Sequence, residues 1–131
     1  MDTKPSLPVK MGICIPVDIQ KDGATVPCIG IHVEMREGHE DDEFPILVPE
    51  IDYRSVRKVD VGKDEFSGMK PGRLYSRFAD GHNCFRVRLN DPVAGEFVAE
   101  LSIQEVKTWF MLACDHDDKI PKKSFLTDLF D

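Results

Sequence analysis

Residues 73–89 read Arg-Leu-Tyr-Ser-Arg-Phe-Ala-Asp-Gly-His-Asn-Cys-Phe-Arg-Val-Arg-Leu and contain the clearest structural signal in the chain. Asp80-Gly81 at the centre favours a two-residue hairpin turn in which both residues take positive φ. On either side of this turn apolar and polar residues alternate, which is typical of half-buried strands. We therefore predict a hairpin whose core face carries Leu74, Phe78, Phe85, Val87 and Leu89.

The opposite face of this hairpin is basic and aromatic. Counting across the turn places Arg73 opposite Arg88, Tyr75 opposite Arg86, and Arg77 opposite Cys84. Guanidinium groups beside an aromatic ring are the side chains with which sheet surfaces bind phosphates and stack bases. The pattern predicts a binding face for an anionic ligand, with single-stranded nucleic acid as one class. The candidate ligand-binding residues are Arg73, Tyr75, Arg77, Arg86 and Arg88.

Internal neutralisation is the alternative for these arginines. The net charge of −7 is unevenly distributed, because residues 31–53 carry eight acids and one base, whereas residues 54–88 carry nine bases and four acids. Glu100 on the next strand can lie opposite Arg86, and the acidic loop at 37–43 could fold over the hairpin. Surface charges often do no more than solvate a domain or pair with each other.

Downstream of the hairpin, a third strand over 96–101 is expected to direct Phe97, Ala99 and Leu101 inward. Ser102 and Glu105 then have the spacing of a capping box, which marks the start of a helix. The helix is expected to end near residues 114–115. Its buried face should carry Ile103, Val106, Phe110 and Ala113, with Trp109 beside it.

Upstream, residues 9–20 alternate with a period of two, and Asp22-Gly23 predicts a second hairpin turn. This alternation places Cys14 and Cys28 on the outward face, and it places Ile29 and Ile31 on the inward face of the return strand. Further strands are expected at 46–48 and 56–61, and residues 62–72 are expected to form a loop.

These elements predict an α+β, mainly β fold. We expect an antiparallel sheet or partly open barrel of about 5–7 strands, covered by one C-terminal helix. Residues 1–131 read as a single domain, in which 1–8 form a flexible arm and 116–131 form a C-terminal tail with a short helix.

Composition points to a soluble, cytoplasmic, acidic protein. The chain shows neither a secretory signal peptide nor an apolar run long enough to span a membrane, so we expect no membrane association. Its four cysteines are scattered, which favours reduced thiols in the cytoplasm. The edge of the first hairpin could also pair with a second copy, so a homodimer remains an alternative.

The sequence carries no recognisable catalytic signature, and we expect a binding domain without a cofactor rather than an enzyme. One alternative is a protein–protein interaction module, an inhibitor or adaptor that acts through the acidic 37–43 loop and the C-terminal tail. A zinc-dependent enzyme is a third alternative. Its candidate metal ligands have a His/Cys spacing of two residues and are His82, Cys84, Cys114 and His116.

Overall fold

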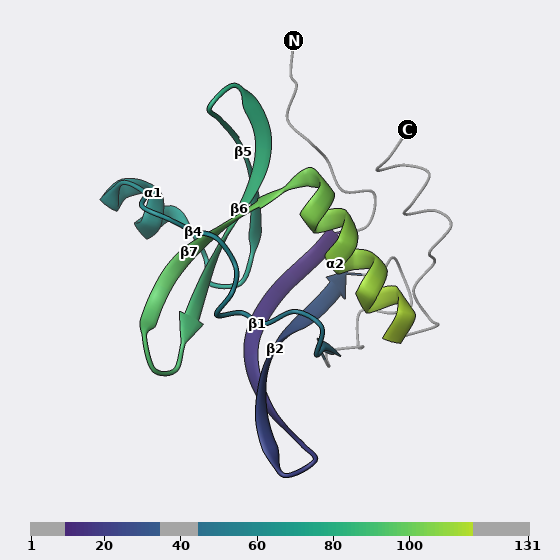
Figure 1. Cartoon of the computed structure of the whole chain (residues 1–131). Coiled ribbons are helices and arrows are strands. Elements are labelled where there is room, and N and C mark those ends of the chain that lie inside the picture. The colour runs from purple at the N-terminus through teal and green to yellow at the C-terminus, as the bar shows by residue number, and fades with distance from the viewer. Residues whose placement is uncertain (1–9, 35–44, 117–131) are drawn as a thin grey trace.

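The computed structural model describes residues 10–34 and 45–116, which form two antiparallel sheets and two helices (Figure 1). The first sheet has the strand order β1-β2-β3, with β1 at Lys10–Lys21, β2 at Ala24–Glu34 and β3 at Ile46–Val48. The second has the order β4-β7-β6-β5, with β4 at Lys58–Val59, β5 at Leu74–Ala79, β6 at His82–Asp91 and β7 at Gly95–Ser102. The predicted class, a mainly β fold of antiparallel strands covered by a C-terminal helix, is confirmed.

Both predicted hairpin turns are present. Asp22 and Gly23 have φ values of 52° and 78°, and Asp80 and Gly81 have φ values of 51° and 81°. These left-handed conformations are tolerated by aspartate and suit glycine, and they match the twist of the flanking strands. The two Asp-Gly pairs therefore set the register of β1 with β2 and of β5 with β6.

The C-terminal helix α2 spans Ile103–His116 and begins where the capping box predicts. The Ser102 hydroxyl accepts a hydrogen bond from the Glu105 N–H at 3.0 Å, and the Glu105 carboxylate accepts one from the Ser102 N–H at 2.9 Å. The helix buries Val106, Phe110 and Ala113 and packs against β3, β6 and β7. It therefore closes one core that both sheets share.

The two sheets do not close into a barrel among the described residues; they are joined at Gly72, which precedes β5. The Gly72 carbonyl accepts a hydrogen bond from the Cys14 N–H of β1 at 2.6 Å, and the Gly72 N–H donates to the Arg88 carbonyl of β6 at 2.7 Å. Gly72 has a φ of 82°, a conformation that favours glycine. One residue therefore links β1 to β6.

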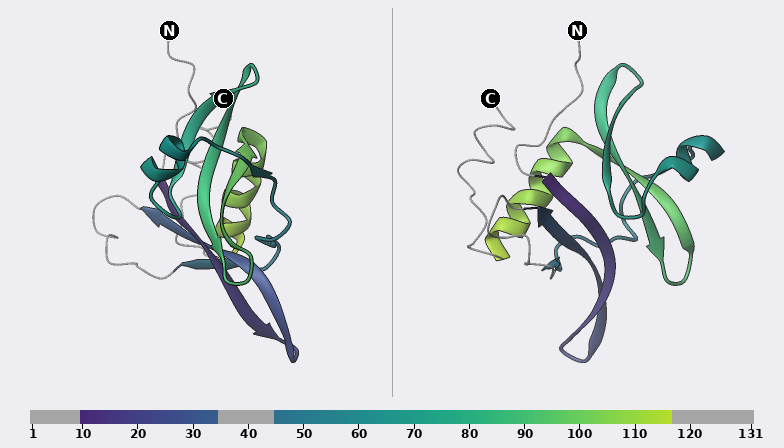
Figure 2. Two further views of the ribbon diagram at one scale, coloured as in Figure 1. Left: turned by 90° about the vertical axis from the view of Figure 1, so that its left-hand side faces the viewer. Right: turned by 180° about the vertical axis from the view of Figure 1, so that it is seen from behind.

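A second helix, α1 at Lys63–Gly68, replaces the loop that we predicted over 62–72. It lies on the face of the four-stranded sheet opposite α2 (Figure 2). The strand predicted over 56–61 is reduced to the two residues of β4, which pair with β7. The sheet is thus covered on both faces, and Val98 and Glu100 on the outer face of β7 are buried along with Ala99 and Leu101.

The predicted exposure is wrong at three positions. Cys14 and Cys28 were expected to face outward, but both are buried. A register shift between Met11 and Cys14 breaks the simple alternation of β1, and Pro45 covers the outer face of β2 at Gly30. Phe78 was expected in the core but is 61% exposed, because it lies near the hairpin tip, beyond the part of β6 that pairs with β7.

The two ends and the 35–44 segment lie outside the described residues. The predictions of a flexible arm at 1–8, an acidic loop at 37–43 and a C-terminal tail with a short helix fall on these segments, apart from His116 at the end of α2.

Candidate functional site

The outward side of β5 and β6 carries the residues predicted to bind a ligand, and we call it the arginine face. As predicted, Tyr75 lies opposite Arg86, and Arg77 lies opposite Cys84. The ladder ends at the pair of Leu74 with Val87, so the predicted Arg73–Arg88 pair is not part of it. Arg73 instead lies in the turn that precedes β5 and is exposed. The sheet therefore groups Tyr75, Arg77, Arg86 and Arg88, with Arg73 at their border.

Helix α1 brings an unpredicted carboxylate onto this face. The two oxygens of Glu65 lie 2.8 and 3.1 Å from Nη1 of Arg86, and one lies 3.4 Å from Nε of Arg77. Burial disfavours ionisation of Glu65, but the hydrogen bonds and charges of Arg86 and Arg77 outweigh it and hold the pKa of its carboxyl below the ordinary value. Glu65 thus neutralises part of the arginine face.

Arg86 is the most enclosed cation of the face. Besides Glu65 it contacts Glu100, which lies opposite it on β7 as the register predicts, with Nη2 at 3.0 Å from the carboxylate. The exposed fractions of the two side chains are 16% for Arg86 and 11% for Glu100. Burial alone would lower the pKa of Arg86, but the hydrogen bonds that it donates to Glu65 and Glu100 raise it. Arg86 is therefore a permanently charged group held between two carboxylates.

Arg88 is also held internally. Its guanidinium lies 4.1 Å from the centroid of the Phe66 ring, a cation–π contact, and donates to the Met69 carbonyl at 3.1 Å. Its Nε donates to the Glu96 carboxylate on β7; this hydrogen bond raises the pKa of Arg88 and lowers that of Glu96. The apolar residues Phe66 and Met69 were the sequence signal that could have indicated α1. We predicted that both belong to a loop.

Arg73, Tyr75 and Arg77 form the more accessible side of the face. The Tyr75 hydroxyl accepts a hydrogen bond from the Lys70 N–H at 2.8 Å, which fixes the ring, and the Arg77 guanidinium lies 5.3 Å from the ring centroid. Arg77 is 33% exposed and shares Glu65 with Arg86. For Arg73 no ion pair with another described residue is present.

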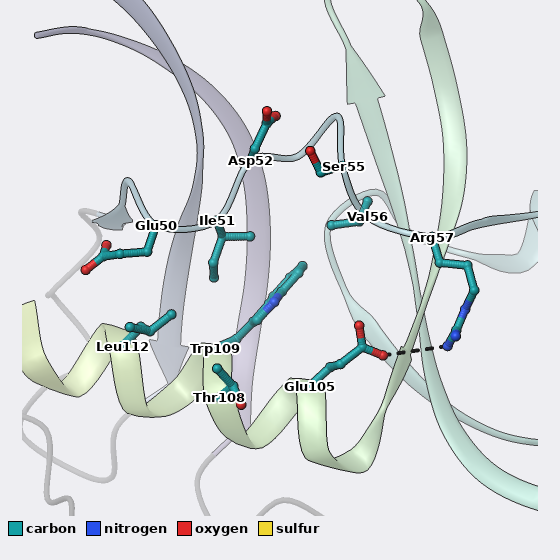
Figure 3. A pocket seen from close by; sticks show the side chains of 10 residues that line it. All are labelled: Glu50, Ile51, Asp52, Ser55, Val56, Arg57, Glu105, Thr108, Trp109 and Leu112. Carbon is teal, nitrogen blue, oxygen red and sulfur yellow. Dashed lines mark ion pairs between the residues drawn. The ribbon is translucent and has the colours of Figure 1, made fainter.

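A second site, which the sequence did not predict, is a groove between α2 and the 50–57 linker that connects β3 to β4 (Figure 3). Its volume is about 400 Å³. Ile51 and Val56 line it from the linker, and Trp109 and Leu112 line it from α2. We call it the acidic groove because its carboxylates are Glu50, Asp52 and Glu105, against one lining arginine, Arg57.

The charged groups around the acidic groove are largely exposed. Arg57 lies 3.6 Å from Glu105 and 3.8 Å from Glu100, so its charge is divided between two carboxylates. At the other end, His116 Nε2 lies 2.9 Å from Glu50. The hydrogen bond from His116 is the main reason that the pKa of Glu50 lies below its ordinary value.

The candidate metal ligands do not form one cluster. Cys84 is buried in β6, whereas His82 is exposed at the hairpin tip, where its Nδ1 lies 3.2 Å from the Asp80 carbonyl. Cys114 is buried on α2, and His116 contacts Glu50. Among residues 10–34 and 45–116, no group of three or more histidine, cysteine, aspartate or glutamate side chains is arranged to hold a metal ion.

Within the described part of the chain, no helix has the length and apolar character needed to cross a membrane. Comparison of the chain with protein-family models, with curated proteins and with solved structures finds no match. The residues of the arginine face and the acidic groove are therefore the basis for a functional proposal.

Proposed function

We propose that this protein is a binding domain, and that Arg73, Tyr75 and Arg77 bind an extended anionic ligand such as single-stranded nucleic acid. The observation that carries this proposal is that Tyr75 and Arg77 share one side of β5, which is the edge strand of its sheet, and that the exposed Arg73 directly precedes this strand. The alternation of the strand puts Tyr75 and Arg77 on one side, and Arg73 extends this line of residues at the start of the edge.

The length of this line favours a ligand with several anionic groups. Arg73 and Arg77 are four residues apart, and because the chain is extended only from Leu74 onward, this corresponds to at most roughly 13 Å. Two guanidiniums at that separation bind separate anionic groups rather than one phosphate. Tyr75 stands between them, where its ring can stack on one base, a contact that contributes about 1–3 kcal/mol in single-strand binding.

The charge balance of the arginine face supports different roles for its enclosed and its accessible arginines. Among residues 10–34 and 45–116, the ion-pair partners of Arg73, Arg77, Arg86 and Arg88 are three glutamates, which are Glu65, Glu96 and Glu100. Arg86 and Arg88 are the more enclosed pair. In this proposal they do not contact the ligand, and they raise the positive electrostatic potential of the face. Arg73 and Arg77 make the contacts, because moving Arg77 away from the shared Glu65 still leaves that carboxylate paired with Arg86.

The test is a fluorescence-anisotropy titration of labelled single-stranded and duplex oligonucleotides, at about 50 mM and about 200 mM salt. We expect salt-sensitive binding that prefers the single strand and falls at least about tenfold in the double variant Arg73→Glu/Arg77→Glu, because each substitution reverses a charge at the ligand. The preference for the single strand reflects the ring of Tyr75, which reaches only unstacked bases.

Arg54→Glu is the matched control. Arg54 is exposed on the linker, where it lies over the ring of Tyr53, and it is not part of the arginine face. It changes the net charge by the same amount per site, so it measures the nonspecific effect of charge. Two outcomes would overturn the proposal. One is failure to bind the oligonucleotides at the lower salt concentration. The other is a loss of affinity in Arg54→Glu that reaches half of the loss in the double variant, compared as logarithms of the dissociation constants.

A further inference from the structure

The geometry points to a second binding site: the acidic groove takes a peptide segment of a partner protein in which one or two large apolar side chains are flanked by lysine or arginine. This site is separate from the arginine face, and the inference does not depend on the function proposed for that face. It rests on the shape of the groove, on its lining and on the charges around it.

The floor of the groove is apolar and aromatic. Ile51 and Val56 point toward Trp109 and Leu112, so side chains from two segments far apart in the sequence meet there (Figure 3). Its volume of about 400 Å³ is within the range of small-ligand sites, roughly 300–1,000 Å³. It therefore suits a side chain such as leucine or phenylalanine rather than a whole folded element.

The charges around this floor select the partner's flanking residues. Glu105 on the helix side points across the groove (Figure 3). Glu50 and Asp52 on the linker side instead point outward from the apolar floor and form its acidic rim, where Glu50 also contacts His116. Arg57 contacts Glu105, but it is shared with Glu100. An apolar peptide with acidic flanks would meet repulsion here, whereas lysine or arginine flanks find complementary charge.

Trp109 makes this proposal directly measurable because it is the single tryptophan of the chain and lines the groove. A change in tryptophan emission during a titration therefore reports on the surroundings of Trp109, and the helix variants below assign it to the groove. The probes are three synthetic peptides without tryptophan: Lys-Lys-Leu-Phe-Lys-Lys, its charge-reversed counterpart Glu-Glu-Leu-Phe-Glu-Glu, and Lys-Lys-Ser-Ser-Lys-Lys, which lacks the apolar pair. Only the first is expected to give saturable binding.

A matched pair of helix variants localises the binding. Thr108 and Met111 are both exposed on α2, but only Thr108 lines the groove. Thr108→Arg places a bulky cation in the groove and is expected to weaken binding of Lys-Lys-Leu-Phe-Lys-Lys at least about fivefold. Met111→Arg adds the same charge to the same helix outside the groove and is expected to change the affinity less than about twofold.

Three results would overturn the proposal. The first is equal binding of the acidic peptide or of the serine peptide, which would remove the charge or the apolar requirement. The second is an equal effect of the two helix variants, which would place binding elsewhere. The third is a change of Trp109 emission with protein concentration alone, which would make a second copy of this chain the occupant.

Discussion

The arginine face and the acidic groove are both charged surfaces, but the fold neutralises their charges to different extents. The arginine face comes from the most basic stretch of the chain, yet it receives Glu65 from α1 and Glu96 and Glu100 from β7. The acidic groove gathers carboxylates from the linker and from α2, and Arg57 is the one arginine or lysine among its described lining residues. A charged run in the sequence therefore does not define a charged surface, because other elements of the fold, α1 and β7, decide how much of it is neutralised.

The two regions also differ in how deeply their ion pairs are enclosed. The Arg86–Glu100 pair lies under α1, between the strands of a sheet that is covered on both faces. The Glu50–His116 pair lies at the edge of the groove, with about two fifths of each side chain exposed. Enclosed pairs are costly to break because a charge is left without a partner, whereas exposed pairs are screened by water and salt. The same type of contact should thus contribute unequally in the two regions.

The largest effect is expected from removal of Glu100. Glu100→Leu should lower the free energy of unfolding by about 3 kcal/mol, because Arg86 loses one of its two carboxylates in an enclosed position. Urea denaturation followed by circular dichroism measures the difference from the wild-type chain.

The double variant Arg86→Met/Glu100→Leu separates loss of the ion pair from poor packing. Replacing both charged partners by apolar groups leaves no unpaired charge, so the double variant should recover a large part of the stability lost in Glu100→Leu. If the double variant is as unstable as the single one, the loss of the Glu100 partner of Arg86 is not the cause.

A smaller effect with a defined pH dependence is expected at Glu65. Glu65→Gln should lower the free energy of unfolding by about 1 kcal/mol near neutral pH, because Arg77 and Arg86 lose a charged acceptor. The pKa of Glu65 is lower in the folded chain than its ordinary value of 4.5. Its stabilisation is therefore complete above that value and is lost as the pH falls through the folded-state pKa. The difference between wild type and Glu65→Gln should shrink as the medium is acidified.

Asp64→Asn is the control for this titration. Asp64 precedes Glu65 on α1 and is exposed, so its substitution changes the same formal charge without touching the two arginines. Urea denaturation at about pH 7 and about pH 3 should show a pH-dependent difference for Glu65→Gln and a smaller one for Asp64→Asn. Equal pH dependence in both variants would mean that the contacts of Glu65 with the arginines add no stability.

The parts of the fold predicted from the sequence are those encoded by neighbouring residues. The Asp-Gly turns and the Ser102–Glu105 capping box depend on local φ values and on side chains three residues apart. Once the second turn is located, counting gives the cross-strand pairing of Tyr75 with Arg86 in β5–β6 and of Arg86 with Glu100 in β6–β7. These pairings require only the period of a strand.

The parts that escaped prediction depend on segments brought from elsewhere. Helix α1 has six residues, too few for a helical period to be recognised, and the contact of Phe66 with Arg88 that holds it to the sheet is tertiary. Cys28 is buried because a distant segment covers its face of β2. The acidic groove was missed for the same reason, since Ile51 and Val56 lie on a linker without periodicity and meet Trp109 only in the folded chain.

The smallest effect is expected at the edge of the acidic groove. Glu50→Gln removes the carboxylate that contacts His116 and should lower the free energy of unfolding by less than about 0.5 kcal/mol, because both side chains are well hydrated. The same substitution removes one of the three carboxylates around the groove, so it should weaken binding of the lysine-flanked peptide while leaving the fold intact. Urea denaturation and the Trp109 titration measure the two effects on one variant. A stability loss as large as that of Glu65→Gln would contradict the distinction between the two regions, because exposure would then not set the strength of their ion pairs.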